Sequence, residues 1–321
     1  MMKTVTFEKC AELLLHADNI LILMHRSPDG DTIGCAYALC LALRKLGKKA
    51  QPFCSDKIPQ KMYSYILDGF EDQTFDIEHV VSVDIADQQL FGDGLERFRD
   101  KVELCIDHHG SNKCFAKSGI IVPEAAACAE IVKCIIEDMG IEADSHIADA
   151  IFTGITTDTG CFKYVSVTPA TMRIAADMIE KGANSGMINR IMFDTKSHAR
   201  LEAERLALDS MKFYFDNRIA VVFVTKKMLE ISGAEESDTE GIASIPRQVE
   251  GVLAGITIKE KDNGICRISL RTAENIDASR ICTFFGGGGH KAAAGCSIEG
   301  TVEQAEAKIV KAAQSVIEES I

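Results

Sequence analysis

The stretch that most constrains the fold is an apolar run, Ile20 to Met24, that stops at His25. The run shows no alternation of polar and apolar residues, which is typical of a parallel strand buried on both faces. Within six residues of His25 the chain then presents Asp29 and Asp31. In open α/β sheets, ligands bind just beyond the carboxyl ends of such strands. The sequence therefore predicts a strand that leads into a ligand-binding loop.

An imidazole and two carboxylates form a ligand set that suits Mn²⁺ or Mg²⁺ better than a thiolate zinc site. Pro28 and Gly30 shape the loop so that both aspartates can turn toward one point. From this stretch alone a second interpretation is equally open. In it, Asp31 caps a helix that starts at Thr32, and His25 is an ordinary loop residue.

Two later apolar runs end in the same residue types. Residues 79–83 are rich in β-branched residues and end at Asp84, and residues 102–106 lead into Asp107, His108 and His109. Adjacent histidines after a buried strand are seldom needed for packing, and histidine is the commonest metal ligand. The recurrence strengthens the prediction of a site at the strand ends.

Together with Asp158, which follows a helical pattern at 144–157, these segments supply two imidazoles and four carboxylates: His25, Asp29, Asp31, Asp84, His108 and Asp158. Two metal ions about 3.5 to 4 Å apart require such a set, with one carboxylate shared. Asp84 is the predicted bridge, and water activated by both ions would attack phosphorus in line. Asp158 could instead cap a helix, and Asp107 is expected to orient an imidazole.

A run of four glycines is the second strong feature: Gly286, Gly287, Gly288 and Gly289, followed by His290 and Lys291. Backbone N–H groups in such a run can converge on an anion, although the pattern is not a P-loop. The alternative is a flexible turn, but four glycines cost backbone entropy that a simple turn does not require. Arg271 and Arg280 are candidates for bidentate phosphate contacts, with solvated surface charge as the alternative.

Composition narrows the class of ligand. The chain has 321 residues, 46% of them hydrophobic, and a formal net charge of −13, which argues against binding long duplex nucleic acid but not short anionic ligands. Its 12 cysteines are scattered without a CxxC pair and are expected to be reduced core residues. No apolar stretch reaches the roughly 18 residues of a membrane span, and the start lacks a signal-peptide pattern. We therefore expect a cytoplasmic protein that does not bind membranes.

Strand and helix patterns alternate along the first part of the chain, which predicts an α/β fold with a doubly wound, mainly parallel sheet. The helices of this part are expected at 6–17, 32–46, 57–69, 124–139, 144–157 and from 169, with a short strand at 49–54. A smaller α/β domain is expected to follow, with strands at 218–225, 251–259 and 265–271 and a closing helix at 302–319. The predicted division is a catalytic domain at 1–195, a connector helix at 196–213 and a substrate-binding domain at 214–321.

The order and spacing of these motifs resemble those of the DHH phosphoesterase superfamily. The resemblance is carried by His25-x-x-x-Asp29-x-Asp31, Asp84, the Asp107-His108-His109 triplet and Asp158. The glycine run with His290, Ala294 and Gly295 resembles the motif of the DHH-associated C-terminal domain. Within the superfamily, a chain of this length resembles bacterial oligoribonucleases, several of which also dephosphorylate 3′-phosphoadenosine 5′-phosphate.

The resemblance implies specific roles for these residues. One Mn²⁺ would be held by His25, Asp29 and Asp84, and the other by Asp31, Asp84, His108 and Asp158. His109 would face the substrate phosphate, while Arg271, the glycines 286–289 and His290 would bind the rest of the nucleotide. Mg²⁺ is the alternative metal, and a homodimer is left open.

The function expected from the resemblance is hydrolysis of short oligoribonucleotides to mononucleotides and of 3′-phosphoadenosine 5′-phosphate to AMP. An alternative is hydrolysis of a cyclic dinucleotide such as cyclic di-AMP at the same site. Less favoured are a single-strand exonuclease of the RecJ type, because the chain is short and acidic, and a non-catalytic nucleotide-binding regulator, because all the expected ligands are present. Rates on linear and cyclic dinucleotides would separate the first two.

Overall fold

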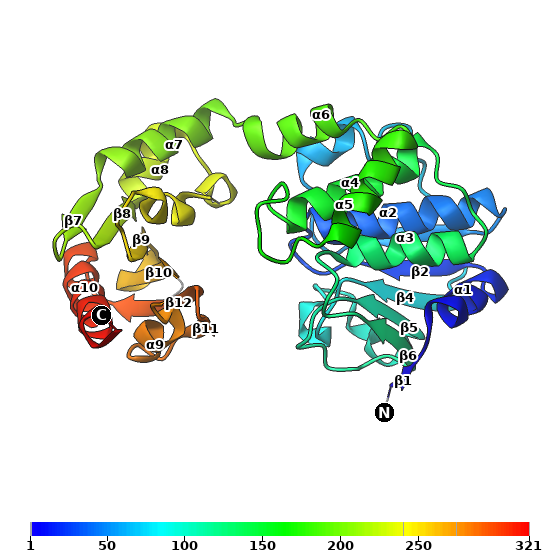
Figure 1. The fold of residues 1–321 in the computed structure, drawn as a ribbon, viewed down its shortest axis with the longest axis horizontal. Coiled ribbons are helices and arrows are strands. Elements are labelled where there is room, and N and C mark those ends of the chain that lie inside the picture. Colours follow the sequence, from blue (N-terminus) through cyan, green and yellow to red (C-terminus); the bar gives the residue numbers. More distant parts are fainter. Residues whose placement is uncertain (1, 240, 274, 321) are drawn as a thin grey trace. The chain divides into compact units, whose positions relative to one another are not determined.

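The chain folds into two compact units, Met1–Thr195 and Lys196–Ile321. The computed structural model describes residues 2–239, 241–273 and 275–320, and each unit has its own sheet and its own hydrophobic core (Figure 1). Within the described residues, every helix is too short or too polar to cross a membrane. The catalytic role of 1–195, the connecting role of 196–213 and the substrate-binding role of 214–321 stay predictions.

The first unit is built on a six-stranded sheet in the order β1-β6-β5-β4-β2-β3, in which all neighbouring strands are parallel. Its strands are β1 (Lys3–Thr4), β2 (Ile20–Leu23), β3 (Ala50–Phe53), β4 (His79–Val83), β5 (Leu104–Asp107) and β6 (Ser118–Ile121). Ile20 and Ile22 of β2 pack into one core and Leu21 and Leu23 into another. Burial on both faces explains why this run lacks alternation.

Helices cover one face of this sheet (Figure 1). They are α1 (Phe7–His16), α2 (Gly30–Lys45), α3 (Cys128–Asp138), α4 (Ser145–Asp158), α5 (Pro169–Glu180) and the short α6 (Ser185–Asn189), which continues into a π-helical turn, η4 (Arg190–Asp194). The opposite face is covered by Phe91, Leu95 and Phe98, in and around two 3₁₀ segments, η2 (Gln88–Leu90) and η3 (Glu96–Lys101). The sheet thus has long helices on one side and short segments on the other.

Close packing between α2 and α4 depends on two glycines. A Cβ on Gly34 would lie 2.3 Å from the carbonyl oxygen of Ala150, and a Cβ on Gly154 would lie 2.6 Å from both Ala129 Cβ and Asp31 Oδ1. Because both positions lack a side chain, the two helices come close enough to bring the last turn of α4 beside the first turn of α2.

The second unit contains a mixed six-stranded sheet in the order β11-β12-β10-β9-β8-β7, in which only β8 and β9 run parallel. The strands are β7 (Lys212–Tyr214), β8 (Ile219–Val224), β9 (Ala254–Glu260), β10 (Ile265–Thr272), β11 (Gly288–His290) and β12 (Ala293–Glu299). One face packs against α9 (Ala278–Thr283) and α10 (Val302–Ser320), and the other against α7 (His198–Asp209) and α8 (Lys226–Ser232). Short 3₁₀ turns complete the unit: η5 (Glu236–Thr239), η6 (Ile242–Ser244), η7 (Pro246–Gln248) and η8 (Asp262–Gly264).

The predicted α/β class and the parallel sheet of the first unit are confirmed. The helix predicted at 57–69 is wrong, because this segment contains only a 3₁₀ turn, η1 (Gln60–Ser64), around the buried Met62. The helix predicted at 196–213 is shorter in the structure. The helix α7 ends at Asp209, and residues 212 and 213 belong to the strand β7. The strand β12 was not expected, because its small residues resemble a loop that flanks the glycine run.

Candidate metal centre

The carboxyl ends of β2, β4 and β5 lie side by side, and polar residues follow each of them. His25 follows β2, and its Nδ1 donates a hydrogen bond to the carbonyl oxygen of Arg26 at 2.8 Å. This bond makes Nδ1 the donor and leaves Nε2 as the candidate ligand atom. His25 Nε2 lies 3.6 Å from Asp29 Oδ1 and 3.7 Å from Asp84 Oδ2.

Asp29 and Asp31 have different local tasks at the start of α2. Asp29 is the N-cap, and its Oδ1 accepts the backbone N–H groups of Asp31 and Thr32, both at 3.1 Å. Asp31 lies in the first turn and is buried, where it accepts the N–H groups of Cys128 at 2.6 Å and Ala129 at 3.0 Å. The interpretation in which Asp31 caps a helix from Thr32 is wrong, because the helix begins at Gly30 and Asp29 caps it.

Asp84 occupies the centre of the cluster. It follows β4 directly and adopts a left-handed backbone conformation with φ 56°, which aspartate and asparagine tolerate better than most residues. Its side chain is 3% exposed, and its Oδ1 makes no hydrogen bond within the described part of the chain. A buried carboxylate oxygen without a hydrogen bond is costly, so this oxygen is suited to bind a cation.

His108 faces three of the carboxylates. Its Nδ1 donates to the carbonyl oxygen of Ala125 at 3.0 Å, which leaves Nε2 free. Nε2 lies 3.4 Å from Asp158 Oδ2, 3.6 Å from Asp84 Oδ1 and 4.0 Å from Asp31 Oδ2. Asp158 is the last residue of α4 rather than a helix cap. Its position beside His108 therefore depends on how α4 packs against α2.

Asp107 is fully buried and saturated with hydrogen bonds. It accepts the N–H groups of His108 at 2.8 Å and His109 at 3.2 Å, His109 Nδ1 at 2.8 Å and Asn112 Nδ2 at 2.6 Å. Asp107 therefore orients His109 rather than facing the cluster. The role of Asn112 as a hydrogen-bond partner of Asp107 was not predicted from the sequence. Only its position three residues after His109 could have indicated this role.

The structure brings all six predicted ligands together in overlapping groups: His25 with Asp29 and Asp84, Asp31 with His108 and Asp158, and Asp84 with His108 and His109. The separations of 3.4 to 4.0 Å are wider than direct charge-assisted hydrogen bonds of about 2.7 to 2.9 Å. Adjacent ligand atoms around a divalent ion at about 2.1 Å are separated by roughly 3 Å. The donor set fits divalent metal ions, and the role of each residue as a ligand stays a prediction.

The cluster is electrostatically unfavourable by itself. Burial, together with the charge of Asp158, raises the pKa of Asp31 to about 7. Burial and the nearby carboxylate of Asp31 also raise the pKa of Asp84 well above its usual range. Both effects arise because carboxylates of like charge are gathered away from water, which a bound cation would relieve.

The second unit positions the other predicted site residues. Gly286 and Gly289 have φ values of 70° and 148°, and a Cβ on Gly287 would lie 2.4 Å from Cys296 Cβ, so these three positions favour glycine. The last two glycines and His290 form β11, an edge strand rather than a free loop.

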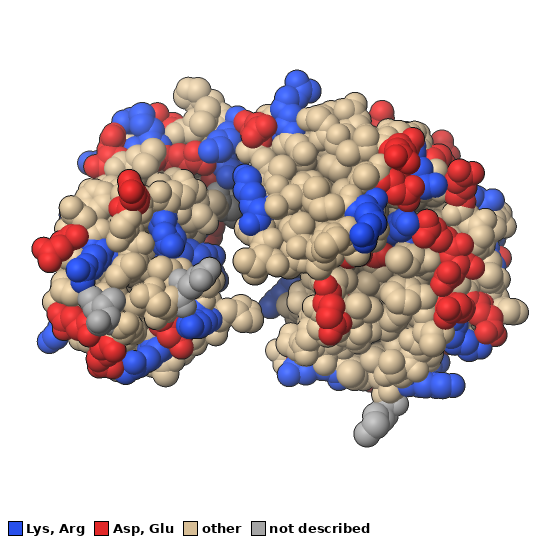
Figure 2. Space-filling view, viewed as in Figure 1, with Lys and Arg blue, Asp and Glu red and all other residues tan. Residues whose placement is uncertain are grey.

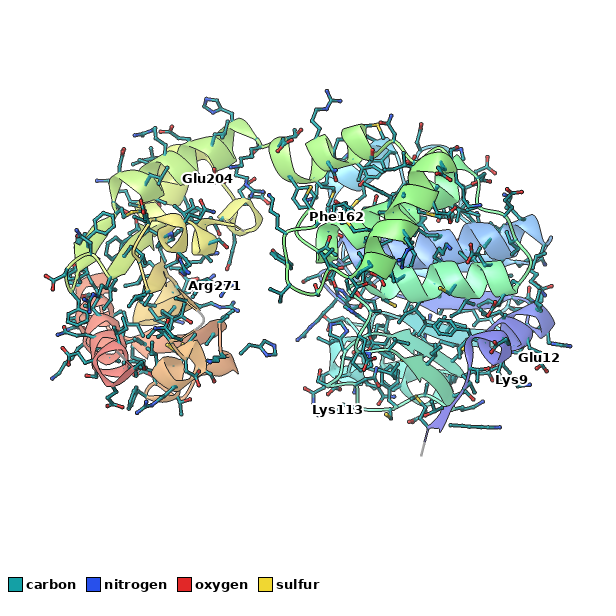
Figure 3. The ribbon with its side chains drawn as sticks, in the orientation of Figure 1. Lys9, Glu12, Lys113, Phe162, Glu204 and Arg271 are labelled. Carbon is teal, nitrogen blue, oxygen red and sulfur yellow. The ribbon has the colours of Figure 1, made fainter. Side chains whose placement is uncertain are left out.

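Arg271, labelled in Figure 3, lies near the end of β10. Its partner in the sheet register is Ala293, which also pairs with His290 on its other side. Residues directly opposite one another in antiparallel strands project to the same face, so Arg271 and His290 share one face of the sheet. Arg280 instead pairs with Glu319 at the surface, in line with the solvated alternative.

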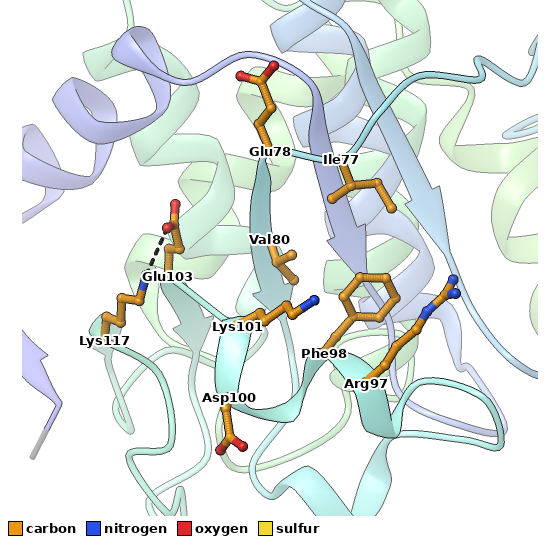
Figure 4. Close-up of a pocket in the computed structure, with 9 residues that line it drawn as sticks. All are labelled: Ile77, Glu78, Val80, Arg97, Phe98, Asp100, Lys101, Glu103 and Lys117. Atoms are coloured by element: carbon orange, nitrogen blue, oxygen red, sulfur yellow. Dashed lines mark hydrogen bonds and ion pairs between the residues drawn. The ribbon is translucent and has the colours of Figure 1, made fainter.

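A cavity of about 390 Å³ lies at the amino ends of β4 and β5, the end of the sheet remote from the metal ligands (Figure 4). Its rim carries an ion pair of 3.0 Å between Glu103 and Lys117. None of the described candidate ligands lines it, so the candidate chemistry does not lie in this cavity.

Comparison with known proteins identifies the family. Residues 19–155 match the DHH family, N-terminal domain, and residues 216–319 match the DHHA1 domain. The bifunctional oligoribonuclease and PAP phosphatase NrnA of Thermus thermophilus is 32% identical, with 91% of this chain and 88% of that protein covered. The protein of the same name from Bacillus subtilis is 24% identical, with 88% and 90% covered. The chain belongs to the DHH family.

The fold also matches that of a solved structure. A protein from Bacteroides fragilis, described as exopolyphosphatase-related, superimposes with a TM-score of 0.87 at 26% sequence identity. The match covers 96% of this chain and 95% of that one, so both units take part in the likeness.

Replacing Asp84 by asparagine removes a buried ionisable carboxyl while keeping a residue that tolerates the left-handed backbone. In chelator, we expect Asp84→Asn to raise the thermal unfolding midpoint by a few degrees, because like-charge repulsion is relieved. Added Mn²⁺ should stabilise the wild-type protein strongly and the variant little, as measured by differential scanning calorimetry. Equal stabilisation of both proteins by Mn²⁺ would contradict the bridging position.

The pH dependence of stability should differ between the metal-free and metal-bound protein. In the metal-free fold, Asp31 keeps its proton up to a pKa of about 7, whereas in the unfolded chain it loses the proton near its usual value. Between these values the folded state binds more protons, so its contribution to the free energy of unfolding falls as pH rises toward 7. Urea unfolding from pH 5 to 8 in chelator should show this fall, and saturating Mn²⁺ should reverse it. The same slope with and without metal would be inconsistent with this account.

Gly154→Ala should weaken metal binding although it replaces no ligand, because the new Cβ would lie 2.6 Å from Asp31 Oδ1 and would displace that carboxylate. We expect a loss of about tenfold or more in Mn²⁺ affinity by isothermal titration calorimetry, as for other disruptions of residues that support metal ligands. Gly186→Ala in α6 is the matched control, since a Cβ there meets nothing within 4 Å. Similar affinities for both variants would refute the steric argument.

Proposed function

We propose that this DHH family chain is a metal-dependent phosphoesterase that hydrolyses short oligoribonucleotides to mononucleotides and 3′-phosphoadenosine 5′-phosphate to AMP. The observation that carries the proposal is the overlap of the candidate ligand groups at Asp84 and His108. The names of two relatives that match over most of their length supply the substrate class.

The ligand groups suggest how two ions would be held. His25 and Asp29 would hold one ion, Asp31, His108 and Asp158 the other, and Asp84 would be shared by both. We assign Mn²⁺ to the site, with Mg²⁺ as the alternative, because the ligands are carboxylates and imidazoles without thiolates. When bound, two such ions supply Lewis-acid activation of water and neutralise charge on the phosphoryl group.

Among the chain's own groups, His109 is suited to handle a proton. Its Nδ1 donates to Asp107, and this hydrogen bond raises the pKa of His109 above its usual value. The ring is 44% exposed, so Nε2 can hold a proton against a phosphoryl oxygen or pass it to the leaving oxygen. Asn112 and the backbone N–H groups keep Asp107 in place for this task.

The second unit would bind the nucleotide. We assign the backbone N–H groups of the glycines 286–289 and the side chains of Arg271 and His290 to contacts with phosphate and sugar. On the face seen in Figure 2, acidic and basic side chains of the described residues are interspersed, without a continuous basic surface. The formal net charge of −13 favours a short substrate over a long duplex.

The direct test is product formation from a 5′-labelled dinucleotide and from 3′-phosphoadenosine 5′-phosphate, each with Mn²⁺ and with chelator. Both should be cleaved with Mn²⁺, and chelator should abolish both reactions. His109→Gln should lower kcat by about 10²-fold or more while Mn²⁺ binding persists, because proton transfer is lost but the six ligands remain.

His198→Gln, at an exposed position in α7, is the matched control and should behave as the wild type. If a cyclic dinucleotide is opened while both linear substrates stay intact, the substrate assignment is wrong although the metal centre stands. If Mn²⁺ binds and no phosphoester is cleaved, the assignment as a phosphoesterase is wrong.

A further inference from the structure

The loop that joins α4 to α5 begins immediately after Asp158 and has an unusual backbone (Figure 1). Gly160, Cys161 and Phe162 follow one another in the left-handed region, with φ values of 56°, 59° and 62°. For a bulky residue such as phenylalanine this conformation is strained, and such strain persists only where the surroundings enforce it. Strained segments of this kind cluster at ligand-binding sites.

Hydrogen bonds hold the loop in this conformation. The N–H of Cys161 donates to the carbonyl oxygen of Thr156 at 2.7 Å, and those of Lys163 and Tyr164 donate to Thr159 at 3.0 and 3.1 Å. The ring of Phe162, labelled in Figure 3, packs at 6.0 Å from the ring of the buried Phe152. The loop is therefore anchored to α4, the helix that also carries Asp158.

This anchored loop presents apolar surface to solvent. Tyr164 is 60% exposed and Val165 is fully exposed. The Tyr164 ring lies directly against Gly160, where a Cβ would be 2.5 Å from its Cζ atom. Residues 159–168 contain one lysine and no acidic residue, in a chain of net charge −13. A rigid exposed aromatic ring in a segment free of negative charge suits a planar, anionic ligand.

We propose that Tyr164 is a base-stacking residue that holds a nucleobase of the substrate whose phosphate is hydrolysed beside Asp158. The inference rests on the proposed function and adds a specificity residue from the first unit. Stacking on an aromatic face needs no particular base, because every base has a π face. Tyr164 therefore selects for the presence of a base next to the scissile phosphate rather than for its identity.

Steady-state kinetics of the Mn²⁺-loaded protein test the proposal with two substrates, a dinucleotide and its analogue without bases. For the dinucleotide, Tyr164→Ala should raise KM by about tenfold and leave kcat within about twofold, because stacking contributes to binding. Tyr164→Phe keeps the ring and should stay within about twofold of the wild type. For the analogue without bases, Tyr164→Ala and the wild type should have the same KM, which a merely structural role would not produce.

Phe213→Ala removes another exposed aromatic residue, from β7, and is the matched control. A second readout uses tyrosine fluorescence, since the chain contains five tyrosines and no tryptophan. Titration with AMP should quench the wild-type emission more than that of Tyr164→Phe, from which the fluorophore at this position is absent.

An unchanged KM for the dinucleotide in Tyr164→Ala, or an equal rise in KM for both substrates, would overturn the stacking role. If the wild-type protein cleaves neither substrate, the proposed function fails, and the AMP titration then decides the role of Tyr164 by itself. Equal quenching in the wild type and Tyr164→Phe would overturn it, and stronger quenching in the wild type would support it.

Discussion

The burial of like charge around Asp84 is the constraint on which the rest of the first unit depends. Asp84 and Asp31 lie next to each other out of contact with water, and the pKa of each is raised as a result. Such an arrangement is unfavourable in a metal-free protein, so the surrounding fold must enforce it. The enforcement comes from the parallel sheet, whose strand ends meet at one edge, and from the start of α3, whose N–H groups bind Asp31.

The ligands are placed by backbone elements and not by flexible loops alone. Each imidazole is oriented by a hydrogen bond from its Nδ1, to Arg26 for His25 and to Ala125 for His108. Asp158 is the last residue of α4, and the close glycine contacts between α2 and α4 help to bring it near the other ligands. Cations would bind to a site that already exists, which reduces the reorganisation that binding requires.

Part of the left-handed backbone of the first unit lies next to the candidate ligands. Asp84 itself is left-handed, and so are the residues 160–162 that follow Asp158. These positions flank the carboxylates, where the helix packing and the sheet can hold them. The second unit follows a different plan, because its glycine run continues into an edge strand and leaves Arg271 and His290 on one face of a mixed sheet.

The sequence by itself determined the α/β class, the buried strand before His25 and the list of polar residues at strand ends, because these depend on local periodicity and on residue chemistry. It did not reveal that Asp29 caps α2 while Asp31 is buried, because both aspartates are equally plausible helix caps when only the sequence is known. The helix predicted at 57–69 was wrong, because the segment forms only the 3₁₀ turn η1. Asn112, the α3 amides and the contact of Gly154 with Asp31 could be found only in the folded chain, because they join residues far apart in sequence or depend on tertiary orientation.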